Sequence, residues 1–184
     1  GGLVRGIRGK IELLQGHFLL AHRHSPWERI FSSKYDGSSA EALLRMGVGR
    51  SPCVLLVRDH NGSVFGAYLP SPIENNSTHY GTGETVLFTV HPSFSVYAAS
   101  GANGLYVLTS PAGLSFGGVI HGDDYGAGLS ISHDLTTGHS SACETYSNTG
   151  SIASAPKFTC VHVELWALLR PPESDAWSKL GHFS

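Results

Sequence analysis

The side chain best suited to act as a nucleophile is Cys143, which has His139 four positions before it and Glu144 beside it. If these residues lay within one turn, the imidazole would lower the pKa of the thiol and produce a thiolate suited to peroxide chemistry or redox sensing. The alternative is a small thiol packed beneath a strand, since cysteine is among the most buried residue types. The pattern leaves both interpretations open and favours the second.

Histidine and aspartate residues are concentrated in one third of the chain, at His121, Asp123, Asp124, His133, Asp134 and His139. A metal ion needs three or four such ligands converging at about 2 Å, and two histidines one helical turn apart commonly supply a pair of them. The sequence contains no such pair of histidines. The dispersed pattern is typical of turns and solvent-facing polar residues, so we expect no metal and no other cofactor.

A serine nucleophile is a further candidate, because Ser32 and Ser33 are followed by Asp36. The Gly-x-Ser-x-Gly motif of many hydrolases is missing, although a triad can assemble from histidines far away in the sequence. The simpler interpretation is structural. The two hydroxyls would hold a corner between a strand and a helix, and Asp36-Gly37 would make its turn.

The segment Gly81-Thr82-Gly83-Glu84 raises the question of phosphate binding. A phosphate-binding loop is followed by a helix and carries a Lys-Ser/Thr pair or a third spaced glycine, and none of these is present here. The glycines therefore indicate a sharp backbone turn into a strand. Glu84 would then bind loop amides or face a partner.

Composition limits the class of protein. Charged residues are only 14% of the 184 residues while glycine is abundant at 23, which favours many turns between strands. The net charge of −2 argues against a nucleic-acid partner, and no apolar stretch is long enough to cross a bilayer. Cys53, Cys143 and Cys160 are too few for a disulfide framework, which points to a reducing, cytoplasmic location.

Two helices are expected in the first quarter of the chain. Apolar residues recur at helical spacing over residues 11–24, and Pro26 ends that segment. The second helix begins at Ser38, which forms a capping box with Glu41, and it ends at Gly47.

Short apolar runs predict strands over residues 30–31, 53–57, 64–69, 86–90, 96–98, 105–108, 114–116, 129–131 and 158–169. Asn61-Gly62 predicts a hairpin between two of them, and residues 101–104 predict a turn between two others. The fold class is therefore α+β and mostly β, with two antiparallel sheets packed as a β-sandwich and a few flanking helices.

The last strand alternates clearly between its two faces. One face carries Cys160, His162, Glu164 and Trp166, and the other carries Val161, Val163, Leu165 and Ala167. If the first face is buried, Glu164 needs a partner, because an unpaired buried carboxylate is very costly. Arg58 is one candidate for that role. If the face is exposed, a glutamate beside a tryptophan forms a docking patch.

We divide the chain into a lead-in over residues 1–10, one domain over residues 11–170 and a tail over residues 171–184. Two prolines at 171–172 close the domain. Trp177 and Leu180 lie three positions apart in the tail, which indicates a helical turn. Because the chain begins at Gly1 without methionine, we expect it to be part of a longer protein.

Five segments occur in a fixed order: Trp27–Ser33 with Asp36–Ser38, Val64–Tyr68, Gly81–Glu84, Cys143–Tyr146 and Val163–Trp166. In this order and at these distances they resemble the TLDc domain, the module of the oxidation-resistance family of eukaryotic proteins. The resemblance extends over about residues 11–169. It implies a sandwich of two antiparallel sheets flanked by helices, with no established catalytic chemistry.

The resemblance also implies protection from oxidative damage and binding to the peripheral, cytosolic sector of the vacuolar-type proton ATPase. A cytoplasmic protein would then reach lysosomal or vacuolar membranes through its partner. Two departures occur, because Phe116-Gly117-Gly118 continues as Val119 and Ala167 follows Trp166, where many members have glycine. The second departure resembles the lysosome-associated, mTOR-linked branch, in which a helix after the domain helps to hold the pump.

Two hypotheses follow. The first is a non-enzymatic protein-interaction domain whose candidate contact residues are Tyr80, Glu84, Glu164, Trp166, Trp177 and Leu180. The second is a thiol-dependent antioxidant enzyme or redox sensor centred on Cys143 and His139. In both, we expect the remaining motif residues to shape the scaffold: Ser32, Ser33, Asp36, Gly37, Gly66, Gly81, Gly83, Gly117 and Gly118.

Overall fold

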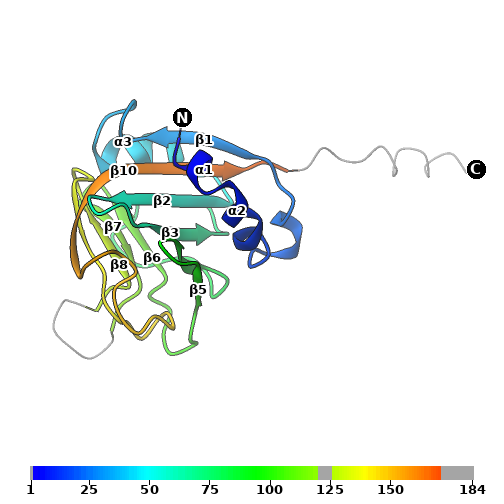
Figure 1. Cartoon of the computed structure of the whole chain (residues 1–184). Coiled ribbons are helices and arrows are strands. Elements are labelled where there is room, and N and C mark those ends of the chain that lie inside the picture. The colour runs from blue at the N-terminus through cyan, green and yellow to red at the C-terminus, as the bar shows by residue number, and fades with distance from the viewer. Residues whose placement is uncertain (1, 120–125, 171–184) are drawn as a thin grey trace, which may run out of the picture.

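A computed structural model of the chain describes residues 2–119 and 126–170 (Figure 1). Its helices are α1 (Leu3–Gly6), α2 (Arg8–Gln15), the 3-10 turn η1 (Leu20–His22) and α3 (Ala40–Gly47). Its strands are β1 (Trp27–Ser32), β2 (Cys53–Asp59), β3 (Val64–Leu69), β4 (Val86–His91), β5 (Ser95–Ala98), β6 (Val107–Ser110), β7 (Gly113–Phe116), β8 (Leu129–Ser132), β9 (Thr137–His139) and β10 (Lys157–Leu168). In this part of the chain no helix is long and apolar enough to cross a membrane.

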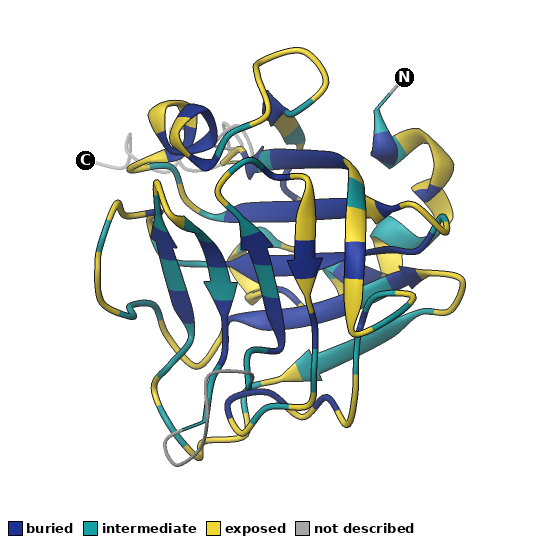
Figure 2. Ribbon diagram, turned by 90° about the vertical axis from the view of Figure 1, so that its left-hand side faces the viewer, coloured by how far each residue is buried: buried dark blue, intermediate teal, exposed yellow. Residues whose placement is uncertain are grey.

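The strands form one antiparallel ladder in the order β5-β4-β3-β2-β10-β9-β8-β7-β6, with β1 also paired to β10. Strand β10 belongs to both halves of the ladder, because its first residues pair with β9 and its later residues pair with β2. The ladder folds over on itself there, so that the strands of one half cross those of the other (Figure 2). The predicted β-sandwich is confirmed, and its two sheets are continuous through β10.

The inner core lies between these two layers. Leu55, Phe65 and Leu87 contribute from one layer, and Phe116 and Ile131 contribute from the other. All five side chains are buried. Neither layer has another way to remove these side chains from water, so burial of the inner face holds the two halves together.

A second, outer core covers the other face of the β1–β5 layer. Leu3 of α1, Leu14 of α2 and Ile7 between the two helices are buried there with Phe18 and Tyr68. The ring centroids of Phe18 and Tyr68 are 4.2 Å apart. Figure 1 shows α1 in front of β10 and α2 in front of β2. Strand β2 is therefore covered on both faces, which explains its unbroken apolar run. The predicted boundary at residue 10 stays a prediction, although residues before it take part in this core.

Both predicted helices differ in detail from the observed ones. The first occupies residues 8–15 rather than 11–24 and is followed by Gly16, a poor helix former. The cap of α3 is Ser39, whose hydroxyl accepts from the Ala42 N–H at 3.0 Å. Ser38 instead donates to the backbone carbonyl of Asp134. The predicted cap is therefore one residue too early, because adjacent serines offer the same signal, while the end at Gly47 is confirmed.

The β2–β3 hairpin turns at Asn61-Gly62 as predicted, with Gly62 at a φ of +87°. Strand β1 is longer than predicted, and β9 was missed because its three residues are polar or glycine. The turn predicted over residues 101–104 separates β5 and β6, and these strands lie at opposite ends of the ladder.

The predicted alternation along β10 is wrong at its start. The register passes from Cys160 opposite Asp59 to His162 opposite Arg58, which leaves Val161 as an extra residue. This β-bulge turns Cys160 toward the inner core, whereas Trp166, which the alternation placed on the same face, packs against the outer core. Val161 is 51% exposed as a result.

Candidate functional site

The first and last of the five sequence segments meet in the β1–β10 pair. In its register Ser32 lies opposite Glu164 and Arg29 lies opposite Trp166. Helix α1 crosses the outer face of the sheet at this place (Figure 1). The pairing therefore gathers hydroxyl, carboxylate, guanidinium and indole groups beneath the N-terminal helices.

The Glu164 carboxylate is completely buried. Its Oε1 accepts from the backbone N–H of Leu3 at 3.0 Å, and its Oε2 accepts from the indole N–H of Trp166 at 2.8 Å. The Arg29 guanidinium lies 3.9 Å from Oε1 and supplies the opposite charge. The ion-pair partner is thus Arg29 and not the predicted candidate Arg58, whose side chain is exposed. We call this group the carboxylate junction.

Trp166 is part of the same junction rather than of an open patch. Its side chain is half-buried in the outer core and lies beside Trp27, with ring centroids 6.4 Å apart. Its only polar group is bound to Glu164. Of the two alternatives for this face of β10, the buried one applies.

His162 lies between Ser32 and Glu164, and these three residue types also make up hydrolase triads. Its Nε2 is 2.9 Å from the Ser32 hydroxyl and 3.3 Å from the Glu164 carboxylate. In a triad the serine and the carboxylate bind opposite ring nitrogens. Here both face the same nitrogen, and Ser32 is completely buried. The group is suited to joining β1 to β10 and does not have the geometry for acyl transfer.

The neighbouring polar residues bind backbone groups. The Ser33 hydroxyl accepts from the Val163 N–H at 2.9 Å, and the Asp36 carboxylate accepts from the Ser32 N–H at 2.8 Å. Gly37 then turns the chain toward α3 with a φ of +97°. These contacts match the structural interpretation of the serine-rich corner.

His162 leads to a prediction about pH. Burial lowers its pKa, and Arg58, Lys34 and Arg29 lower it further against the attraction of Glu164. Below the unfolded value of 6.5, the unfolded chain binds a proton that the folded chain does not, so stability falls as the pH drops below that value. We expect the urea midpoint to be lower at about pH 5.5 than at about pH 7.5.

A His162→Gln variant should show a smaller fall over the same interval. Part of the fall should remain, because burial also lowers the pKa values of His22 and His79. Urea unfolding at the two pH values, compared between variant and parent, measures the difference. An equal or steeper fall in the variant would show that His162 is not the group responsible.

The other loop segments converge on Tyr106. A Cβ at Gly81 would lie 3.6 Å from the Tyr106 Cβ, and one at Gly83 would lie 3.3 Å from its hydroxyl oxygen. The Tyr146 hydroxyl donates to the Tyr106 carbonyl at 2.9 Å, and the Gly117 N–H donates to the same carbonyl at 3.2 Å. We call this second group the Tyr106 junction.

Gly117 illustrates why this junction needs its residue types. Its φ is +85°, and a Cβ there would lie 2.8 Å from the Cys143 sulfur and 3.0 Å from the Tyr146 ring. The next N–H, from Gly118, donates to the hydroxyl of the buried Thr145 at 2.9 Å. The Cys143–Tyr146 segment therefore packs against and hydrogen-bonds the turn formed by Gly117 and Gly118.

Two predicted contact residues close to this junction differ in exposure. The Tyr80 hydroxyl accepts from the Glu74 N–H at 3.0 Å and lies 2.6 Å from the Thr109 hydroxyl, so its polar group is engaged within the chain. Glu84 is exposed, and a hydrogen bond from the Thr82 side chain lowers its pKa. Of the two, Glu84 presents the charged group to solvent.

The Cys143 thiol donates to the Asn148 side-chain oxygen at 3.4 Å and packs against the inner core, where it is half-buried. His139 lies on β9, opposite Lys157 and Ser130 in the ladder. The reactive-thiol hypothesis for Cys143 and His139 stays a prediction.

The other two thiols are expected to react slowly. Burial raises the pKa values of Cys53 and Cys160 to about 12. Near neutral pH the fraction of either residue that is present as thiolate is therefore below about one in ten thousand. We expect iodoacetamide to modify them only after unfolding in urea, as measured by mass spectrometry of the peptides. Rapid labelling of Cys53 in the folded chain would contradict this. Equally slow labelling of Cys143 would count against a redox sensor.

The predicted histidine- and aspartate-rich region is only partly described. Within residues 2–119 and 126–170, no group of three metal-ligating side chains comes together. Asp134 accepts hydrogen bonds from the Ser132 and Thr136 hydroxyls, which hold its pKa at about 2. Three of the candidate metal ligands, His121, Asp123 and Asp124, lie outside the described part of the chain. The proposed contact residues Trp177 and Leu180 of the tail also lie outside it.

Sequence reasoning assigned no site role to Arg29 or Tyr106, and it placed His162 on the face of Glu164 without assigning a contact between them. His162 is two positions from Glu164 on one strand, and that spacing was a usable signal for their contact. Arg29 is inside the first sequence segment, but only the β1–β10 register shows that it reaches Glu164. Nothing in the sequence singled out Tyr106.

Comparison with known proteins agrees with these motifs. The family model of the TLDc domain matches residues 10–169. MTOR-associated protein MEAK7 of Gallus gallus is 33% identical over a match that covers 92% of this chain and 39% of that protein. The human oxidation resistance protein 1 is 31% identical, covering 86% and 18%, and the human nuclear receptor coactivator 7 is 33% identical, covering 77% and 15%. The chain thus spans less than two fifths of these curated relatives.

Proposed function

Because this chain belongs to the TLDc domain family, we propose that it is a protein-interaction domain that acts by binding and not by catalysis. One observation carries the proposal. Glu164, the acidic residue of the last motif, stabilises the scaffold, since its carboxylate is completely buried and bound by Leu3, Trp166 and Arg29. Groups held in this way support a rigid outer surface, which is what recognition requires.

The proposed partner is the peripheral, cytosolic sector of the vacuolar-type proton ATPase, as the family resemblance implies. In this proposal the domain is cytoplasmic, is recruited to lysosomal or vacuolar membranes by that partner, and contributes to resistance against oxidative stress. The name of oxidation resistance protein 1 supports the proposed role in oxidative stress, and the name of MTOR-associated protein MEAK7 supports a role in binding other proteins. The pump itself is proposed from the family resemblance.

We propose that Glu84 contributes to the contact surface. It is exposed and charged, and the neighbouring glycine turns pack against Tyr106, which gives the carboxylate a fixed base. Trp177 and Leu180 of the tail remain part of the proposal as additional anchors. Aromatic and apolar anchors of this kind commonly dominate the binding energy of an interface.

A pull-down from cytosol tests the proposal, with the intact chain and with a chain cut after Pro172 as baits. We expect the intact chain to enrich pump subunits, with less enrichment by the shortened chain. Glu84→Lys should weaken capture, whereas Glu12→Lys, an equal charge change at an exposed position on α2, should not. If neither bait enriches pump subunits, the proposed partner is wrong.

A thiol-dependent antioxidant activity is the alternative proposal, favoured by the partial exposure of Cys143 within the fourth motif. It predicts that the purified chain consumes hydrogen peroxide and that Cys143→Ser abolishes this activity. Cys53→Ser serves as the control, because that thiol is buried and its pKa is raised to about 12. Peroxide consumption that both variants retain would exclude Cys143 as the reactive group.

A further inference from the structure

A groove of about 500 Å³ lies where the N-terminal helices meet the bulged end of β10. We call it the basic groove, because its lining includes five basic side chains, and no aspartate or glutamate lines it: Lys10, Lys34, Arg58, His91 and His162. They come from α2, the turn after β1, β2, β4 and β10. Five separate elements therefore direct basic groups toward one volume.

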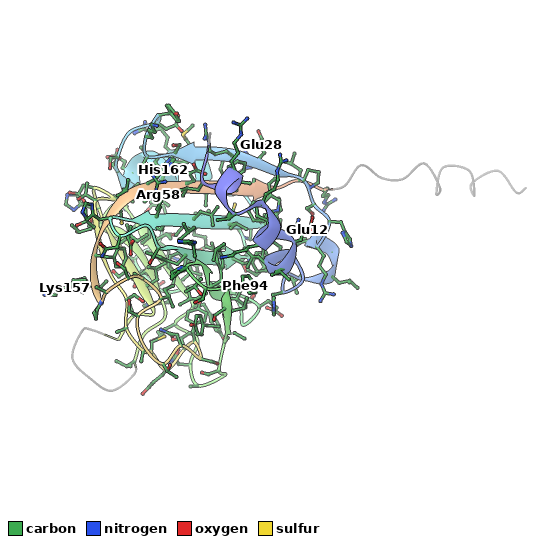
Figure 3. All side chains as sticks on the ribbon, viewed as in Figure 1. Glu12, Glu28, Arg58, Phe94, Lys157 and His162 are labelled. Atoms are coloured by element: carbon green, nitrogen blue, oxygen red, sulfur yellow. The ribbon has the colours of Figure 1, made fainter. Side chains whose placement is uncertain are left out.

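The sheet register fixes the centre of this groove. Arg58 on β2 pairs directly with His162 on β10, and Figure 3 labels the two residues one above the other, to the left of α1. Arg58 is exposed, whereas His162 is only 7% exposed and closes the groove on its inner side. Lys34 is also close enough to His162 to lower its pKa.

Among the described residues, Lys34 and Arg58 of the basic groove have no acidic partner, whereas His162 lies beside Glu164. The ion pairs among the described residues join Arg29 to Glu164, Arg50 to Glu28, and His162 to Glu164. None of them includes Lys34 or Arg58. Clustered like charges without counter-charges repel one another, so such a cluster favours the binding of an anion.

The backbone leaves the groove accessible. Gly6 at the end of α1 and Gly62 in the β2–β3 turn both line the groove. A Cβ at either position would meet no atom within 4 Å, so the space beside them is open. The volume is within the range of small-molecule sites and is too compact for an extended acidic peptide. A phosphate group concentrates up to two negative charges and several acceptor oxygens, which suits an arginine fork beside a lysine.

We infer that the basic groove binds a small ligand carrying two or more phosphate groups, with Arg58 and Lys34 as the principal contacts. This site lies apart from Glu84 and does not depend on a pump partner. The same chemistry is available from a soluble inositol phosphate or from a phosphoinositide headgroup.

Binding of inositol trisphosphate to the purified full chain at low salt, followed by calorimetry, tests the inference. We expect Arg58→Gln and Lys34→Gln each to weaken binding about tenfold, since a charged hydrogen bond contributes on the order of that factor. Lys157→Gln removes the same charge from the far end of β10, outside the groove, and should leave the affinity within about twofold. Unchanged thermal midpoints would show that all three variants fold, as expected for exposed side chains.

Two further arms identify the source of the phosphates. The first uses phosphatidylcholine vesicles that contain phosphatidylinositol bisphosphate. If these vesicles bind the parent chain but not Arg58→Gln, the ligand is a lipid headgroup. Binding of the soluble trisphosphate without binding to vesicles would assign a free ligand. The inference is overturned if neither binds, if Arg58→Gln and Lys34→Gln bind as the parent does, or if a polyglutamate peptide competes as well as the trisphosphate. None of these outcomes depends on the pull-down.

Discussion

Replacing Glu164 with alanine is expected to lower the free energy of unfolding by about 3–5 kcal/mol. The carboxylate is completely buried, and its removal leaves the Leu3 N–H and the Trp166 indole N–H without an acceptor. It also leaves Arg29 without its buried counter-ion, although that side chain is 33% exposed and regains some hydration. A loss of this size is a large fraction of the stability of a typical domain.

The loss should be smaller in Glu164→Gln, at about 1–3 kcal/mol. The amide oxygen can still accept one of the two N–H groups, while the amide NH₂ faces donors on the other side. Urea unfolding with a common m-value measures both variants. Hydrogen exchange provides a second measurement, because loss of the Leu3 hydrogen bond should increase exchange in α1 and α2 before the sheet opens.

Glu28→Ala is the matched control for this experiment. Glu28 lies on β1, and its carboxylate is 3.5 Å from Arg50, with the two side chains 54% and 41% exposed. Exposed pairs of this kind contribute at most about 1 kcal/mol. If Glu164→Ala costs no more than Glu28→Ala, the carboxylate junction does not hold the N-terminal helices to the sheet.

Local signals explain the parts of the fold that the sequence predicts well. Asn61-Gly62 specifies the β2–β3 turn because both residues tolerate positive φ, and the unbroken apolar run of β2 indicates burial on both faces. The bulge at Val161 could not be foreseen, because it is a mismatch between β10 and β2 and appears in neither strand alone. Strand β9 was missed for the opposite reason, since it has too little apolar pattern of its own.

The candidate site shows the same division. The sequence indicated that Glu164 would need a partner if buried and suggested Arg58, whereas the structure pairs it with Arg29. Both arginines lie on the outer side of the sheet, but the register places Arg58 opposite His162 and Arg29 opposite Trp166, and these registers join segments more than one hundred residues apart. The hydrogen bond from the Leu3 backbone N–H to Glu164 could not be predicted either, because a backbone donor is the same in every residue except proline.

Both junctions place motif residues where they shape the backbone. Glu164 joins β10 to the N-terminal helices, and Gly117 and Tyr146 fix the loops around Tyr106. The motifs that make the family recognisable therefore describe how this chain folds. Selectivity for a partner or ligand must come from exposed residues outside most of these motifs, such as Arg58 and Lys34 in the basic groove.

Gly66 is where this structural constraint is strongest, and Gly66→Ala is expected to lower the free energy of unfolding by more than about 4 kcal/mol or to prevent folding. A Cβ at this position would overlap the backbone carbonyl oxygen of Leu55 and lie 2.8 Å from its carbonyl carbon. It would also lie 3.2 Å from the Phe88 ring. A ring can rotate, but the carbonyl belongs to the neighbouring strand β2, so relief requires β2 and β3 to separate.

Gly9→Ala provides the opposite result in the same chain. Gly9 lies within α2, where a Cβ would meet no atom within 4 Å, and its helical backbone suits alanine. The substitution should stabilise the fold by about 0.5–1 kcal/mol, because glycine loses more backbone freedom on folding. Urea midpoints, or circular dichroism and protease sensitivity where Gly66→Ala stays unfolded, measure the contrast. A Gly66→Ala chain about as stable as its parent would mean that β2 and β3 do not approach as closely as the register implies, because nothing else could accommodate the methyl group.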